Sequence, residues 1–189
     1  RLGPTRASAA RAPDVLLHPG PSPLPPPEGV ELRRVETAEE MRAAVADALP
    51  AADVLVMAAA VADFRPADPA GEKIKKEAGG APEIRLERTA DVLASTRELR
   101  RPGSVTVGFA LETTDLLRNG RRKLEGKGLD LLVLNDATEP GAGFEVRTNR
   151  VTFLLPGGGE EPLPLMHKGD VADRILDRVE VILAERGAS

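Results

Sequence analysis

Three mostly apolar segments, each about the length of a strand, constrain the fold of this chain more than any other feature. They span residues 54–60, 105–110 and 129–134, and segments with helical character separate them. The first of them, residues 54–60, is a continuous apolar run, which is typical of a central parallel strand that is covered on both faces. The order strand, helix, strand, helix, strand is that of a parallel α/β sheet. The pattern therefore predicts a three-layer α/β fold.

Helical segments with clear N-terminal signals accompany these strands. Thr37 and Glu40 form a capping box that opens the first of them. Further helices are expected over residues 90–99 and 114–127. A last helix is expected to begin at Asp170, whose side chain is predicted to cap it. These helices would cover the two faces of the sheet.

The final third of the chain departs from this alternation. Residues 150–155 and 162–166 flank the sequence Pro156-Gly157-Gly158-Gly159, which predicts a β-hairpin. The predicted fold class is therefore α/β, a Rossmann-like three-layer fold with a mainly parallel central sheet and an antiparallel β-hairpin extension.

Composition excludes several classes of function. The 189 residues include no cysteine, which excludes a disulfide scaffold and a thiolate zinc site. No apolar run approaches the roughly 20 residues that a membrane span needs. A net charge of −4 and an aromatic content of 2% argue against nucleic-acid binding. We therefore expect a cytoplasmic domain with neither a membrane nor a nucleic acid as its partner.

Lysines gather in two places. The stretch Lys73-Ile74-Lys75-Lys76 lies in a segment without a convincing period, residues 63–80, which is predicted to be a long loop. Lys123 and Lys127 are spaced to share one face of a predicted helix. Each cluster could be a solvated charged surface. Together they point to a polyphosphate ligand such as a nucleoside triphosphate.

Small residues follow the first apolar run. Ala58, Ala59 and Ala60 would let a ligand approach the backbone at the carboxyl end of a strand, which is where open parallel sheets bind ligands. Asp63 offers a carboxylate for a ribose hydroxyl, a metal or an amine, or it caps a turn. No Gly-x-Gly-x-x-Gly sequence follows a strand and no Walker A sequence is present, which argues against a conventional dinucleotide site and a P-loop.

Several of these segments, taken in order, resemble the phosphopantothenate–cysteine ligase family. The resemblance covers the chain from about Val30 to its C-terminus. In most bacteria this ligase is the C-terminal half of a bifunctional protein whose other half is a flavin-dependent decarboxylase. The matching sequences are Met57-Ala58-Ala59-Ala60-Val61-Ala62-Asp63-Phe64-Arg65-Pro66, Lys73-Ile74-Lys75-Lys76, Gly108-Phe109-Ala110-Leu111-Glu112-Thr113, the pair Lys123 and Lys127, and Asn135-Asp136.

The resemblance implies a carbon–nitrogen ligase of coenzyme A biosynthesis. Its substrates would be 4′-phosphopantothenate, L-cysteine and CTP. CTP would activate the carboxylate of phosphopantothenate as an acyl-cytidylate and release pyrophosphate, and the cysteine amine would then give 4′-phosphopantothenoylcysteine and CMP. The family uses Mg²⁺ with the nucleotide, through ligands that the sequence does not identify, and it assembles as homodimers.

The resemblance also implies a set of site residues, carried over by matching positions. Lys73 is the expected catalytic lysine, which would stabilise charge on the activated intermediate. The nucleotide-binding residues would be Met57, Ala58, Ala59, Asp63, Lys73, Ala90, Asp91, Val92, Leu93, Phe109, Lys123 and Lys127.

Two departures from the family pattern stand out. The family binds the phosphopantothenate moiety with a segment of the form Asn-x-Ser-Ser-Gly, and no asparagine precedes Asn119 in this chain. We therefore expect one ligase domain over residues 1–189 that lacks this N-terminal segment. In addition, Thr89-Ala90-Asp91 stands where the family usually has Asn-Pro-Asp.

Two other functions stay open at this point. A Rossmann-like oxidoreductase would bind NAD(P), and binding of a nicotinamide nucleotide without CTP would favour it. A catalytically silent nucleotide-binding or scaffold module is the second alternative, and it gains if neither nucleotide binds.

Overall fold

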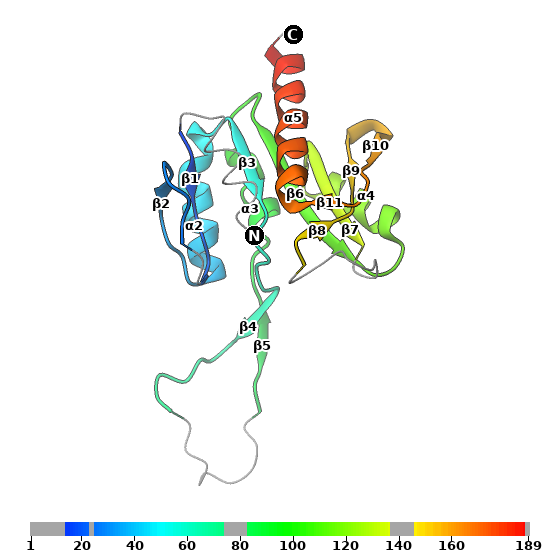
Figure 1. Cartoon of the computed structure of the whole chain (residues 1–189). Coiled ribbons are helices and arrows are strands. Elements are labelled where there is room, and N and C mark those ends of the chain that lie inside the picture. Colours follow the sequence, from blue (N-terminus) through cyan, green and yellow to red (C-terminus); the bar gives the residue numbers. More distant parts are fainter. Residues whose placement is uncertain (1–13, 23–24, 74–82, 137–145, 188–189) are drawn as a thin grey trace.

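A five-stranded sheet forms the centre of the structure, a computed structural model that describes residues 14–22, 25–73, 83–136 and 146–187 (Figure 1). Its strands are β3 (Val54–Met57), β6 (Val105–Glu112), β7 (Leu131–Asp136), β9 (Val151–Leu154) and β10 (Glu160–Pro162). They follow the order β10-β9-β7-β6-β3. β3, β6 and β7 pair in parallel, whereas β9 and β10 are antiparallel additions. The predicted α/β fold with a hairpin extension is therefore confirmed.

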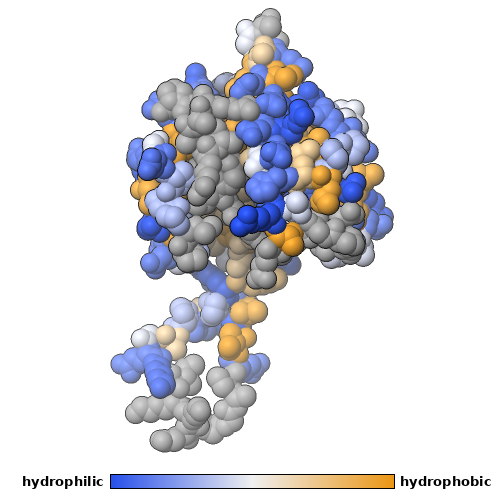
Figure 2. Space-filling model, in the orientation of Figure 1, coloured by the Kyte–Doolittle hydropathy of each residue, from blue (hydrophilic) through white to orange (hydrophobic). Residues whose placement is uncertain are grey.

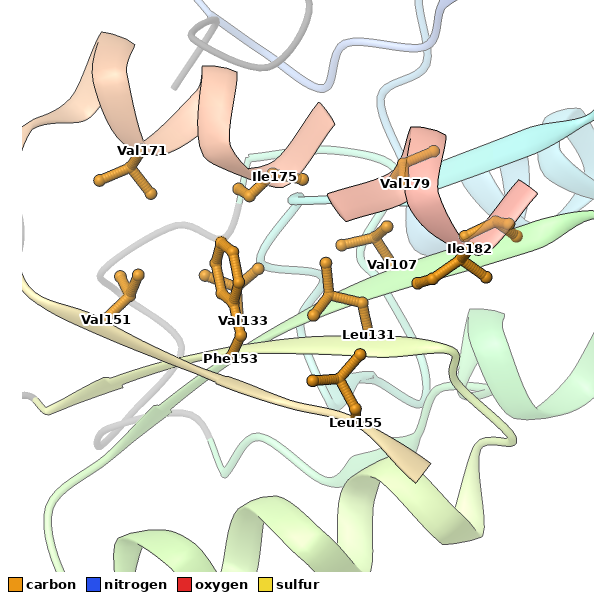
Figure 3. Packing of buried hydrophobic residues seen from close by; sticks show 11 residues of the cluster. Val107, Leu131, Val133, Val151, Phe153, Leu155, Val171, Ile175, Val179 and Ile182 are labelled. Carbon is orange, nitrogen blue, oxygen red and sulfur yellow. The ribbon is translucent and has the colours of Figure 1, made fainter. Parts of the chain in front are cut away.

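Helices lie on both faces of this sheet, which gives three layers. α5 (Lys168–Gly187) covers one face, and Figure 3 shows its apolar side chains over those of the strands. α3 (Val92–Ser95) and α4 (Leu116–Gly126) cover the other face. In the described ranges, none of the helices combines the length and the apolar character that crossing a bilayer requires.

Alternation along the strands creates two cores. Successive strand residues point to opposite faces, so Val105 and Val107 of β6 lie beneath α5, whereas Ala110 lies beneath α4. The larger core consists of Val105, Val107, Leu131, Val133, Val151, Phe153, Leu155, Val171, Ile175, Val179 and Ile182.

Gly120 lets α4 approach the second face closely. A Cβ atom at this position would lie 2.6 Å from Cδ1 of Leu154 and 3.3 Å from Cδ2 of Leu134. A larger residue would therefore require these leucine side chains to move or the helix to shift on the sheet.

A smaller unit lies beside β3 (Figure 1). β1 (Leu16–Leu17) and β2 (Glu31–Leu32) form a parallel pair, and α2 (Ala38–Ala48) continues into a 3₁₀ turn, η1 (Leu49–Ala51). α2 packs against α3 through an apolar cluster that includes Val92.

The predicted cap of α2 is confirmed in part. The side chain of Thr37 accepts a hydrogen bond from the backbone N–H of Glu40 at 3.1 Å. The carboxylate of Glu40 accepts from the N–H of Glu36 at 2.7 Å, one residue further back than the capping box predicts. Both bonds satisfy amides at the start of the helix.

An antiparallel ribbon, here called the arm, projects away from the sheet (Figure 1). It consists of β4 (Phe64–Pro66) and β5 (Leu86–Arg88), with Pro66 opposite Leu86. The sequence predicted a loop over residues 63–80, and this was wrong for β4, because three residues are too few to show a period.

Two helices differ from prediction at their ends. The helix expected over 90–99 is divided into α3 and η2 (Arg97–Leu99). The buried side chain of Thr96 donates to the carbonyl of Val92 at 2.6 Å, and its backbone leaves the helical region there. α4 is slightly shorter than the predicted 114–127.

α5 begins at Lys168, so Asp170 lies in the first turn and does not precede the helix as a cap. The reason is that β11 (Met166–His167) pairs with β8 (Thr148–Asn149) and runs directly into the helix.

Two strand boundaries also differ from their predicted positions. The strand expected over 162–166 is β10 at 160–162, and the turn before it is η3 (Pro156–Gly158). The first apolar run is a strand only as far as Met57, where its pairing with β6 ends.

Candidate functional site

The carboxyl ends of β3, β6 and β7 meet at one edge of the sheet. Met57, the last residue of β3, is paired with Gly108, and Glu112 at the end of β6 is paired with Asp136. β6 and β7 therefore continue past the end of β3 and leave a step there. Ala59, which follows β3, is exposed at this step. Such an edge is the usual ligand position of an open parallel sheet.

Met57 and Phe109 point to opposite faces of the sheet. Met57 packs against the clusters under α4 and α2, whereas Phe109 packs against the core under α5. Both residues were predicted to bind the nucleotide, and the structure places them on neighbouring strands. Because their side chains lie on opposite faces, they can contribute to one binding site only at the carboxyl edge of the sheet. Ala58, which follows Met57, is half-buried.

Lys123 is held by a carboxylate at the end of β6. Its Nζ atom lies 2.6 Å from Oε1 of Glu112, whose side chain is 13% exposed. A largely buried carboxylate needs a cation as its partner, so this pair fixes the lysine beside the edge. Sequence reasoning missed Glu112 as a site residue, although it lies within the matched sequence 108–113, because nothing in the sequence shows that β6 and α4 bring the two side chains together.

Lys127 is held in the same way by Asp91. Its Nζ atom lies 2.9 Å from Oδ2 of Asp91. The other oxygen of Asp91 accepts from the backbone N–H of Ala94 at 3.1 Å and thereby caps α3. Burial alone would raise the pKa of Asp91, but the hydrogen bonds from Lys127 and from the amides of Ala94 and Leu93 outweigh burial and lower this pKa.

The two ion pairs therefore lie four residues apart, one on the last turn of α4 and the other at the residue that follows this helix. The structure brings Asp91, Glu112, Lys123 and Lys127 together, and each carboxylate offsets the repulsion that two lysines at this spacing would otherwise produce. A triphosphate could replace the carboxylates as the partner of both ammonium groups. This arrangement can bind a polyanion.

The stretch from Ala90 to Leu93 mainly positions the Asp91–Lys127 pair, and few of its side chains are open to a ligand. Val92 and Leu93 are buried against α2 and beneath α4 respectively, whereas Ala90 is exposed. Of this predicted stretch, only Ala90 and Asp91 have side chains that a ligand could reach.

Asp63 lies directly before β4, at the base of the arm, and Lys73 lies beyond the end of β4. The carbonyl of Asp63 accepts from the N–H of Thr89 at 3.0 Å, and the hydroxyl of Thr89 donates to the carbonyl of Ala62, so the base of the arm is tied to the residue before Ala90. Lys73 is exposed beyond β4, where the chain runs away from the sheet (Figure 1). The structure therefore does not bring Lys73 to the other predicted residues, and Lys75 and Lys76 lie outside the described residues.

A pair of asparagines lies at the same edge. Nδ2 of Asn149 donates to Oδ1 of Asn135 at 2.9 Å, and Asn149 is buried. Sequence reasoning missed Asn149, because a lone asparagine in a sequence carries no signal of its own. In the described parts of the chain, no three His, Asp or Glu side chains form a cluster that could hold a metal ion by themselves.

The Asp91–Lys127 pair gives a prediction about pH. A carboxyl whose folded pKa is lowered stabilises the fold above its unfolded pKa of about 3.9, and this stabilisation is lost as the pH falls through the folded value. Asp91→Asn keeps a good helix cap and removes only the charge. Because the pair is partly exposed, the variant should lose up to about 1 kcal/mol at pH 7 and almost nothing near pH 2. Urea unfolding at both pH values measures this, and an equal loss at both would contradict the lowered pKa.

Comparison with known proteins now gives the family. Residues 4–182 match the family model described as "DNA/pantothenate metabolism flavoprotein C-terminal domain". The chain is 40% identical over 174 residues to the coenzyme A biosynthesis bifunctional protein CoaBC of Bacillus subtilis, covering 92% of this chain and 42% of that protein. It is 44% identical over 189 residues to the protein of the same name from Mycobacterium tuberculosis, covering 95% of this chain and 45% of that protein. The chain thus spans less than half the length of these curated relatives.

Solved structures agree with this assignment. The crystal structure of the C-terminal domain of CoaBC superposes with a TM-score of 0.80 at 31% identity, over 97% of this chain and 81% of that one. A Cab2 variant in complex with phosphopantothenate-cysteine superposes with a TM-score of 0.62 at 19% identity, over 84% of this chain and 55% of that one, and it supports the fold alone. The resemblance found in the sequence is therefore confirmed, and the chain belongs to the DNA/pantothenate metabolism flavoprotein C-terminal domain family, which forms the C-terminal part of the bifunctional CoaBC proteins.

Proposed function

We propose that this chain is a CTP-dependent phosphopantothenate–cysteine ligase domain of coenzyme A biosynthesis, which in its relatives is fused to a decarboxylase. The observation that carries the proposal is the pair of lysines at the end of α4, Lys123 and Lys127, each held beside the sheet edge by a carboxylate. The family resemblance assigns both lysines to the nucleotide. The identity of 40–44% to CoaBC proteins supports the same reaction.

The proposed reaction has two steps. A carboxylate oxygen of 4′-phosphopantothenate forms a bond to the α-phosphorus of CTP, and the bond from that phosphorus to pyrophosphate breaks. The amine of L-cysteine then attacks the acyl carbon of the cytidylate, loses a proton, and displaces CMP. Both steps depend on positioned cations more than on a strong base, because negative charge builds up on phosphate and acyl oxygens.

The residues of this chain have distinct parts in that reaction. Lys123 and Lys127 would exchange their carboxylate partners for phosphate oxygens of the bound CTP. Lys73 would stabilise charge on the acyl-cytidylate. Mg²⁺ bound with the nucleotide would neutralise part of the triphosphate charge. The carboxylates of Asp91 and Glu112 fit this ion, because Mg²⁺ in nucleotide sites takes one or two carboxylates together with phosphate oxygens and water.

Calorimetric titration of CTP in the presence of Mg²⁺ tests the proposal. We expect Lys127→Ala and Lys123→Ala each to weaken CTP binding, whereas Lys168→Ala, at the start of α5, should leave it unchanged. Binding of a nicotinamide nucleotide without CTP would instead favour an oxidoreductase. Binding of neither nucleotide would favour a scaffold module.

The nucleotide preference is a separate prediction. We expect CTP to bind more tightly than ATP, because the resemblance is to bacterial enzymes that use CTP and because the small residues after β3, Ala58 and Ala59, suit a pyrimidine. Competition between CTP and ATP at equal concentration measures the preference. Equal or tighter binding of ATP would contradict the choice of nucleotide without contradicting the ligase assignment.

The proposal includes a homodimer, and the arm supports it. Figure 2 shows apolar side chains gathered along the arm. Phe64, Ile84 and Leu86 are 49%, 66% and 58% exposed. The strand register places Pro66 opposite Leu86 and Phe64 opposite Arg88, so these side chains share one face, while Arg65 pairs with Glu87 at 2.7 Å on the other. A two-stranded ribbon is only marginally stable in water, and a second copy of the chain would cover its apolar face.

Leu86→Glu is expected to dissociate this dimer, because it places a charge in the middle of the apolar face. Sedimentation velocity would show the mass change from dimer to monomer at micromolar concentration. Leu165→Glu is the matched control, since Leu165 is 43% exposed on another part of the molecule. A dimer that survives Leu86→Glu would mean that the arm is not the interface.

A further inference from the structure

The side chain of Arg100 joins the two segments that carry the Asp91–Lys127 ion pair. Its Nη2 atom donates to the carbonyl of Leu93 at 2.7 Å and to the carbonyl of Lys127 at 3.0 Å. Its Nη1 atom donates to the carbonyl of Gly128 at 2.5 Å. One half-buried guanidinium group therefore connects α3 to the end of α4.

The end of α4 explains why these carbonyls need a donor. Gly128 has a φ of +56° and follows the last helical turn. Its N–H donates to the carbonyl of Glu125 at 3.0 Å, and the N–H of Leu129 donates to the carbonyl of Leu124 at 2.9 Å. These two bonds form a Schellman cap, which ends the helix and satisfies the carbonyls of Leu124 and Glu125 but not those of the residues that follow. The carbonyls of Lys127 and Gly128 receive their hydrogen bonds from Arg100.

We propose that Arg100 is a positioning residue for nucleotide binding. It fixes α3 against the end of α4, so that Asp91 and Lys127 meet and the ammonium group of Lys127 is presented to the triphosphate. This inference rests on the proposed function, because it assumes that Lys127 binds CTP. Arg100 itself lies behind the pair and does not contact the nucleotide.

Arginine is the residue type that this position requires. A guanidinium group is planar and offers donors in a fixed fork, so it can bind carbonyls from two elements at once. A lysine at position 100 would keep the charge but could not hold the same three carbonyls in one plane. The segments carrying Asp91 and Lys127 would then be free to shift relative to each other.

The first test is Arg100→Lys, followed by calorimetric titration with CTP and Mg²⁺. The dissociation constant for CTP should rise by about tenfold, as for other residues that act through a ligand-binding side chain. In a ligation assay the KM for CTP should rise by a similar factor while kcat and the KM for cysteine change little. Arg101→Lys is the matched control, because Arg101 is exposed and pairs with Asp53 away from α4.

A double-mutant cycle separates positioning from a general loss of structure. In a Lys127→Ala background, Arg100→Lys should have almost no further effect on CTP affinity, because the side chain that it positions is gone. An additive effect of the two changes would overturn the proposal. So would normal CTP affinity of Arg100→Lys when Lys127→Ala alone weakens binding, and this result would leave the proposed function intact.

A measurement on the unmodified chain covers the case in which Arg100→Lys does not fold. Because one guanidinium group ties them together, the amides of residues 92–96 and 127–129 should gain protection from hydrogen exchange together when CTP binds. Protection of only one segment would overturn the proposal. No effect of CTP on either segment, together with no change on Lys127→Ala, would refute the proposed nucleotide site and the inference that rests on it.

Discussion

Replacement of Lys73 with alanine is expected to slow cysteine ligation by about a hundredfold or more while the affinity for CTP stays nearly unchanged. Lys73 is proposed to stabilise charge that develops on the activated intermediate. Interactions made mainly in the transition state appear in the turnover rate and little in ground-state binding. The rate of phosphopantothenoylcysteine formation and a calorimetric titration with CTP measure the two quantities separately.

Lys168→Ala is the control for this experiment, because Lys168 lies outside both lysine clusters. The result also bears on the arm, since Lys73 lies beyond β4 and away from the sheet edge. A large loss of turnover would mean that this end of the arm contacts the intermediate during the reaction. Near-normal turnover of Lys73→Ala would mean that this lysine is a solvated charge.

Leu131→Ala is expected to produce the largest loss of stability, about 2–5 kcal/mol. Leu131 is fully buried in β7, beneath α5, where its side chain packs within the larger core (Figure 3). The loss combines the transfer free energy of the missing methyl groups with the cost of the cavity. Since domains of this kind are stable by about 5–15 kcal/mol, the variant could be partly unfolded at 37 °C.

Urea unfolding monitored by circular dichroism gives the free energy for both the variant and its control. Leu117→Ala is matched in chemistry, because Leu117 is 46% exposed at the start of α4. It should cost about 0.5 kcal/mol or less. Similar losses for the two leucines would contradict the placement of Leu131 in the core.

The sheet could be predicted from the sequence because its signal is local. The segments 105–110 and 129–134 are mostly apolar, as is typical of strands covered on both faces, and they became β6 and β7. The arm could not be predicted in the same way. β4 and β5 have three residues each, and pairs such as Arg65 with Glu87 become visible only when the strands are side by side.

The candidate site was predictable as a set of residues but not as an arrangement. Lys123 and Lys127 were singled out from their spacing, yet the carboxylates that hold them come from β6 and from the cap of α3. Such contacts depend on how helices and strands pack against each other, so a local sequence pattern cannot predict them. Sequence reasoning also grouped Met57 with Phe109, although the pleat of neighbouring strands sends them to opposite faces.

The outer strand of the sheet has a consequence for aggregation. β10 consists of only Glu160, Glu161 and Pro162. One of its edges pairs with β9, and β10 is the last strand in the order of the sheet. An exposed strand edge can recruit strands from other molecules, but proline lacks the N–H that such pairing needs, and the charged Glu160 and Glu161 are each held in an ion pair with an arginine of this chain. A chain with Glu160→Thr, Glu161→Thr and Pro162→Val would present a neutral strand edge without a proline. We expect it to form β-rich aggregates at lower protein concentrations than the present sequence does.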